Sequence, residues 1–295
     1  MVILFMRRQR VIMLRILIIV VVMVGGCSFA SCAETLPVNA SVDNNTGSVN
    51  NILDGLQKAA AGLKSYQCKV EYLFSQPVLE SKTLRTGELK YARLGAGSKL
   101  RINFNTLSQD DGPQQNYKEC YIFDGQWLTH IDYQIKQVQK RQLAEANEPI
   151  DAFELAKRNF PIIGFGKSED LAKQFDVNLI EPPQSVIPAS PSVIPAQAKR
   201  SGVPLCGAGI QNLIHLHLSV KPGSQYADQY KAVDIWIDKA SMLPAKIDAV
   251  STEGDIYQIK FIDPKVNQAI DESVFEFTIP ADFGKPEIIP LKKQD

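Results

Sequence analysis

Two long stretches of the chain, 66–131 and 233–283, place apolar residues at every second position. A period of two is typical of β-strands that have one buried and one solvated face. Turn residues divide both stretches into short runs, for example at Asp124-Gly125 and Asp263-Pro264. The pattern predicts an antiparallel sheet with one apolar face, with roughly three or four of its strands within 233–283.

Apolar residues recur at helical spacing in three other places. The first is 49–63, where Ser48 is suited to cap the first turn, and the second is 149–160. The third is 168–175, and we place Phe175 on this helix. Roughly ten strands in a curved sheet, with three modest helices over one face, leave room for an apolar cavity between sheet and helices.

The N-terminus has the pattern of an export signal. Four arginines precede an uninterrupted apolar run at 16–24. This run is too short to cross a bilayer comfortably, and it has the length of a signal-peptide core. We therefore predict that residues 1–26 are a signal peptide and that the protein is exported.

Two cleavage patterns compete just after this run. Val24-Gly25-Gly26-Cys27 resembles the lipobox of bacterial lipoproteins, whereas Ser31-Cys32-Ala33 suits ordinary signal peptidase. We favour the first pattern, in which Cys27 is acylated and anchors the protein to a membrane. Residues 27–48 are small and polar without an apolar period, so they are predicted to form a flexible tether.

The segment 182–208 interrupts the alternating pattern. It is rich in Pro and Ala, and the pentapeptide SVIPA occurs in it twice. Because proline cannot donate to a strand ladder, we predict an exposed insertion within a sheet domain that covers 49–283. Residues 284–295 are predicted to be a loose tail.

The sequence contains none of the common catalytic, phosphate-binding or dinucleotide-binding motifs. His215 and His217 would share one strand face, but His130 is the only other histidine, and a zinc site needs three or four ligands. Basic and acidic residues balance at 32 each, which does not favour nucleic acid as a partner. We expect no catalysis, no cofactor and no metal site, with Cys68 and Cys120 as buried free thiols.

Four segments in a fixed order resemble one known family. They are LQKAAAGLKSYQCKVEY at 56–72, TGELKYARLGAGSKLRINF at 86–104, FDGQWLTHIDYQIKQV at 123–138, and VDIWIDKASMLPAKIDAVSTEGDIYQIKFIDPKVNQAIDESVFEFTIPADFG at 233–284. The chain from 49 to 283, without 182–208, resembles the LolA/LolB-like outer-membrane lipoprotein carriers.

The resemblance implies an α+β fold, an incomplete antiparallel β-barrel (half-barrel) whose helices lid an apolar cavity for the acyl chains of lipoproteins or lipids. It implies non-catalytic transfer in the bacterial periplasm, by a soluble carrier or by a receptor anchored as a lipoprotein. In the carriers an arginine after the second strand bonds to the lid and helps to hold it shut, and Arg93 matches that position. The family usually has proline next, where this chain has Leu94. The receptor exposes an apolar residue on a protruding loop, for which Leu107 is the candidate.

The residues predicted to line the cavity are apolar members of one strand face. They are Val70, Tyr72, Phe74, Leu89, Tyr91, Ile102, Phe104, Ile235, Ile237, Ile259 and Phe261. Their assignment depends on register, because a slip of one residue turns a strand over. A second hypothesis is an envelope-stress sensor of the RseB type, which uses the same half-barrel as a protein-interaction domain.

Overall fold

The structure, a computed structural model, describes residues 44–94, 97–145, 148–152, 168–180 and 212–291. These residues form one sheet of 12 strands in the order β12-β6-β5-β4-β3-β2-β1-β11-β10-β9-β8-β7. The strands are β1 Ser65–Gln76, β2 Ser81–Leu94, β3 Gly97–Gln109, β4 Gln115–Phe123, β5 Trp127–Asp132, β6 Gln137–Gln142, β7 Phe175–Ile180, β8 Leu213–Val220, β9 Tyr230–Asp238, β10 Leu243–Ser251, β11 Ile256–Val266 and β12 Glu287–Ile289.

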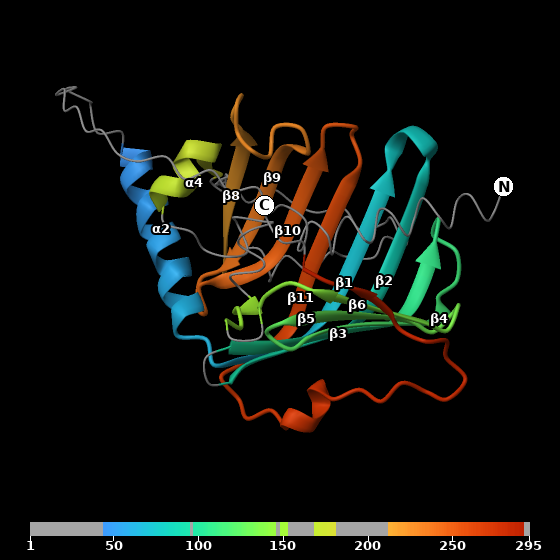
Figure 1. The fold of residues 1–295 in the computed structure, drawn as a ribbon. Helices are drawn as coiled ribbons and strands as arrows, with labels where there is room; N and C mark the ends of the chain where they lie inside the picture. Colours follow the sequence, from blue (N-terminus) through green and yellow to red (C-terminus); the bar gives the residue numbers. More distant parts are fainter. Residues whose placement is uncertain (1–43, 95–96, 146–147, 153–167, 181–211, 292–295) are drawn as a thin grey trace, which may run out of the picture.

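Neighbouring strands are antiparallel, except that β12 pairs with β6 in parallel. The sheet ends at β7 and β12 and does not close on itself. It is strongly bent: β8–β11, β1 and β2 stand together in Figure 1, whereas β3, β5 and β6 lie across them. The predicted fold class, an incomplete antiparallel barrel, is confirmed.

One face of the sheet, called here the inner face, carries the apolar side chains that the period of two predicted. Strand register sets them side by side: Tyr72 of β1 lies opposite Ile259 of β11, which lies opposite Ile247 of β10, which in turn lies opposite Ile235 of β9. Because side chains alternate along each strand, the residues two positions before and after each member of this row also lie on the inner face.

Two helices cover one end of the inner face. They are α2 (Asn44–Ala61) and α4 (Ser168–Gln174), and Figure 1 shows them together beside β8. Leu56 of α2 and Leu171 of α4 join one buried cluster with Leu216, Ile235 and other residues of β7–β10. The helices are therefore stabilised by burying one apolar stripe against the sheet.

The outer face is covered in part by the segment that follows β11. This segment contains the 3-10 helix η3 (Glu272–Phe275) and runs beneath β3 in Figure 1. Phe277 and Phe283 pack on Ile122 and Ile131 of the outer face. Nη1 of Arg101 donates hydrogen bonds to two backbone carbonyl oxygens of the segment, at 2.8 and 3.1 Å.

Several element boundaries differ from the predictions. Helix α2 begins at Asn44, so residues 44–48 continue the helix rather than the tether, because a helix nucleated by packing can extend beyond its apolar stripe. Phe175 is the first residue of β7 and not the end of a helix, since the sheet takes it into the core. The predicted loose tail at 284–295 contains β12, which the edge of β6 holds through backbone hydrogen bonds.

The stretch 233–283 contributes only three strands, β9, β10 and β11. Its last residues leave the sheet after Val266 and place Phe275 on the outer side of β3. Several predictions fall outside the described residues. They are the signal peptide, Cys27, most of the tether, the insertion at 182–208 and most of the helix at 149–160.

Gly87 lies where the register between β2 and β3 shifts. A Cβ atom at this position would lie only 1.8 Å from the carbonyl oxygen of Asn103. Gly87 pairs with Val70 on one side and Phe104 on the other, so its missing side chain also leaves room on the inner face. The close approach therefore requires glycine.

We expect Gly87→Ala to lower the free energy of unfolding by at least about 2 kcal/mol, because the backbone of β3 must move to admit the methyl group. Urea unfolding measures this loss. Gly47→Ala is the control, since a Cβ at Gly47 has nothing within 4 Å. Equal stability of the two variants would contradict a close backbone approach at Gly87.

Candidate functional site

All the residues predicted to line a cavity lie on the inner face or pack against its clusters. Val70, Tyr72, Phe74 and Phe104 form one cluster with Tyr121, and Ile102 and Ile259 pack against it. Tyr91 belongs to a second cluster, against which Leu89 packs, and Ile235 and Ile237 belong to a third. Phe261 packs against the second and the third cluster. The sequence therefore predicted their common face. Their role as the lining of a ligand cavity stays a prediction.

The inner face is covered unevenly. The cluster at β7–β10 contains Leu56 of α2 and Leu171 of α4. By contrast, Val70, Tyr72, Phe74, Phe104 and Tyr121, together with the residues that pack on them, come from strands β1, β3, β4 and β11. We call this set of five the strand-only cluster. Its rings contact one another directly, with the centroids of Tyr72 and Phe104 6.3 Å apart.

A charged pair is buried beside the strand-only cluster. Nε of Arg85 lies 3.8 Å from Oε2 of Glu119, and both side chains are about 95 % removed from solvent, at 5 % and 4 % exposed. Glu119 accepts hydrogen bonds from the hydroxyl groups of Tyr117 at 2.8 Å and Tyr121 at 2.6 Å. Its Oε1 also lies 2.9 Å from Nε2 of His130.

Burial alone would raise the pKa of Glu119. The hydrogen bond and charge of His130, the charge of Arg85 and the hydrogen bond from Tyr121 outweigh burial and hold this pKa below its usual value. The ring of His130 also stacks on Tyr121, with centroids 4.5 Å apart. Glu119 is therefore an ionised acceptor at neutral pH, held by groups from β2, β4 and β5.

Two donors in this region lack a hydrogen-bond partner among the described residues. They are the hydroxyl of Tyr72 and Nε of Arg85. Tyr72 is 3 % exposed and Arg85 is 4 % exposed, and their positions are paired across β1 and β2. Burial raises the pKa of the Tyr72 hydroxyl, with Arg85 opposing that effect, so the hydroxyl keeps its proton.

Arg93 lies within β2, one residue before its end, rather than after the strand. Its Nη1 donates a hydrogen bond of 2.9 Å to the carbonyl oxygen of Ala61, the last residue of α2. Its Nε lies 3.3 Å from Oδ2 of Asp151, which also accepts a hydrogen bond of 2.9 Å from Tyr91. Arg93 thus joins the sheet to the C-terminal end of α2.

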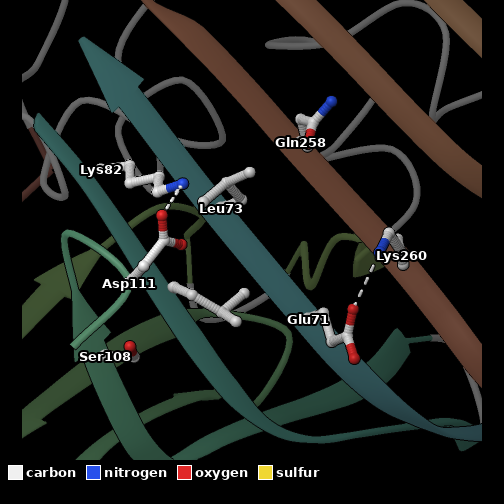
Figure 2. A pocket seen from close by; sticks show the side chains of 8 residues that line it. Glu71, Leu73, Lys82, Ser108, Asp111, Gln258 and Lys260 are labelled. Carbon is white, nitrogen blue, oxygen red and sulfur yellow. Dashed lines mark hydrogen bonds and ion pairs between the residues drawn. The ribbon is translucent and has the colours of Figure 1, made fainter. Parts of the chain in front are cut away.

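A shallow pocket lies on the opposite, outer face, with a volume of about 200 Å³. Figure 2 shows its charged rim: Lys82 points to Asp111, and Nζ of Lys260 lies 3.1 Å from Oε2 of Glu71. Leu73 supplies part of its apolar floor. These charges already pair with one another, and the pocket is separate from the predicted cavity lining.

His215 and His217 also lie on the outer face, and both bond to Oδ1 of Asp234, at 2.8 and 2.9 Å. The ring of His215 stacks on Trp236. Within the part of the chain that the structure describes, no group of three His, Cys, Asp or Glu side chains is arranged to hold a metal ion. No helix in that same part is long and apolar enough to cross a membrane.

Leu107 does not occupy an exposed loop. It lies within β3, is partly buried and pairs with Arg85. Among the described residues, the two most exposed large apolar side chains are instead Val78 and Leu79 in η1 (Pro77–Leu79), at the tip of the β1–β2 hairpin. They are 85 % and 57 % exposed.

Sequence reasoning missed the buried polar group on the inner face. A signal was present, because Arg85 shares the period of two with Leu89 and Tyr91, and Glu119 shares it with Tyr121. A charged residue at a core position of an alternating strand indicates a buried partner or a ligand.

No family model and no curated protein matches the sequence. Among solved structures, the chain is similar to the Pseudomonas aeruginosa MucA/MucB complex (TM-score 0.41, 15 % identity, 78 % of this chain and 61 % of that chain). It is also similar to the Mycobacterium tuberculosis lipoprotein LppX (0.39, 10 %, 76 % and 98 %) and to a LolA superfamily protein from Nitrosomonas europaea (0.30, 10 %, 77 % and 96 %).

Replacing Glu119 tests the buried charge pair. Because its folded pKa lies below the unfolded value of about 4.3, Glu119 adds stability that is complete above that pH and is lost as the pH falls through the folded pKa. We expect Glu119→Gln to cost about 3–5 kcal/mol at pH 7, since Arg85 loses its counter-charge, and to cost less near pH 3.5.

Urea unfolding at pH 7, 5 and 3.5 measures this dependence. Glu88→Gln is the matched control, because Glu88 lies on β2 with its side chain 54 % exposed. An equal cost of Glu119→Gln at all three pH values would contradict a lowered pKa.

Proposed function

We propose that the protein binds acyl chains of lipoproteins or lipids against the inner face of its sheet and transfers them within the bacterial envelope, without catalysis. The observation that carries this proposal is the strand-only cluster. It is a continuous apolar and aromatic cluster on a bent, open sheet, and among the described residues no side chain of α2 or α4 belongs to it or packs against it. Ligand sites with these properties take apolar molecules.

Burial of the chain supplies the binding energy. Each methylene removed from water contributes about 0.8 kcal/mol, so a sixteen-carbon chain offers roughly 11 kcal/mol. A bilayer offers a similar amount, and the protein competes with it only when most of the chain is covered. Because the side chains of the strand-only cluster are already buried, an acyl chain enters only when these side chains or the elements around them move apart.

Arg93 is the proposed latch for this opening. Its bonds to Ala61 and Asp151 connect the end of β2 to α2 and to the loop after β6, so breaking them would loosen α2 at its C-terminal end. The guanidinium reaches both acceptors at once, which a lysine ammonium cannot do from one position.

Binding of a fluorescent long-chain acyl probe to the purified protein tests the proposal. We expect saturable binding, and we expect Ile102→Ser to weaken it about tenfold, because Ile102 packs on the strand-only cluster. Leu73→Ser is the matched control, since Leu73 lies on the outer face and is also partly buried. Absence of probe binding to the unaltered protein would overturn the proposal.

The same probe tests the latch. We expect Arg93→Lys to raise both the association and the release rate of the probe severalfold while the equilibrium affinity changes less, because a weaker latch lowers the barrier to opening in both directions. Stopped-flow fluorescence measures the two rates. Unchanged rates would remove Arg93 from the mechanism.

A second candidate function is a protein-interaction domain, as in the sensor hypothesis. The exposed pair Val78 and Leu79 at a hairpin tip favours it, because large apolar side chains this exposed and adjacent are suited to a partner surface. The two functions differ in the acyl-probe experiment, since a pure interaction domain needs no acyl chain.

We further propose that the protein is exported to the periplasm and anchored by a lipid at Cys27. The apolar run at 16–24 and the small residues before Cys27 support this location. Metabolic labelling with a radioactive fatty acid should mark the unaltered protein and leave Cys27→Ala unmarked. Equal labelling of both would contradict the anchor and leave cleavage by ordinary signal peptidase.

A further inference from the structure

Two buried donors on the inner face lack acceptors. The hydroxyl of Tyr72 and Nε of Arg85 have no hydrogen-bond partner among the described residues, although both residues are at least 96 % buried. Their residues are cross-strand partners in β1 and β2, so they share one face at neighbouring positions. Leaving buried donors unsatisfied is costly, and native structures seldom do so without a reason.

The neighbouring acceptor does not satisfy them. Glu119 is the nearby carboxylate, but its Oε2 lies 3.8 Å from Nε of Arg85, beyond hydrogen-bond distance. Its oxygens already accept from Tyr117 and Tyr121 and face His130. Guanidinium nitrogen can only donate, so the missing element is an acceptor oxygen.

The surroundings of the two donors are apolar and aromatic. Tyr72 packs against Phe104 and belongs to the strand-only cluster, and Ile259 lies opposite Tyr72 on β11. The ring of Tyr117 lies under the Arg85 guanidinium, 5.5 Å from it. A molecule that fits here combines an apolar chain with an oxygen acceptor at one end.

We propose that Tyr72 and Arg85 bind the oxygen-bearing end of the acyl cargo, a carboxylate or an ester carbonyl, while its chain lies along the strand-only cluster. This inference rests on the proposed function and adds to it the position and chemistry of the polar end. Glu119 balances the charge of Arg85 when no ligand is present. The ligand oxygen accepts hydrogen bonds from the two donors that Glu119 leaves unsatisfied.

Competition experiments test this site with three ligands of equal chain length. Palmitate, methyl palmitate and hexadecane each displace the fluorescent acyl probe, and only the first two carry an acceptor oxygen. We expect either or both oxygen-bearing ligands to bind at least about tenfold more tightly than hexadecane, the strength of one or two buried hydrogen bonds. Their relative affinities distinguish a free acid from an ester as the natural ligand.

Two substitutions separate the site from the fold. Tyr72→Phe removes only an unsatisfied hydroxyl, so it should leave stability unchanged or higher and weaken the oxygen-bearing ligands about threefold to tenfold. Arg85→Lys keeps a positive charge beside Glu119 and removes the Nε donor, and the same selective loss is expected. Hexadecane binding should not change in either variant. Tyr133→Phe, on the outer face against Phe283, is the control and should change nothing.

The outcomes distinguish this inference from the proposed function. Equal affinity for all three ligands, or no loss of selectivity in Tyr72→Phe, would overturn the polar site and leave acyl binding intact. Failure of the unaltered protein to bind the probe or any of the three ligands would overturn both.

Discussion

A bent sheet that does not close cannot cover the whole of its inner face with its own strands, and this constraint shapes the rest of the structure. At β7–β10 the cover is provided by α2 and α4, whose apolar side chains join the strand core. In the middle of the sheet, the bend brings side chains of β1, β3, β4 and β11 together beside Gly87, which has no side chain of its own. The inner face is therefore a helix-covered core at one end and an aromatic surface made by strands at the other.

Burying the charged pair Arg85–Glu119 on the inner face costs free energy. Two charges removed from water regain their hydration energy only with good geometry and full hydrogen bonding, and an apolar pair of similar size is often as stable. Here Glu119 is well satisfied and Arg85 is not. A buried arginine with an unsatisfied Nε lowers stability, but the same arginine can donate a hydrogen bond to a bound ligand.

The period of two was sufficient to predict which residues share the inner face, because pleating allows no other arrangement once a face is buried. It was insufficient for features that depend on partners far along the chain. The pairing of Arg85 with Glu119 requires the register of β2, β3 and β4, including the shift beside Gly87. Likewise β12 forms because β6 offers a free edge, and its own sequence, Glu287–Ile289, is too short to predict a strand. Arg93 was found through family resemblance, since a surface arginine at a strand end has no distinctive pattern.

Strand β2 connects the proposed latch to the proposed polar site. Arg85, Gly87, Tyr91 and Arg93 occupy alternate positions along it, so one strand carries the unsatisfied donor, the close approach to β3 and the bonds to Asp151 and α2. The strand is paired along its whole length with β1 and β3 and cannot easily change shape. In the proposed mechanism, opening would therefore come from α2 and the loop that holds Asp151, moving against a fixed strand. A ligand oxygen bound at Arg85 would then be held by the rigid part of the molecule while the cover opens and closes over its chain.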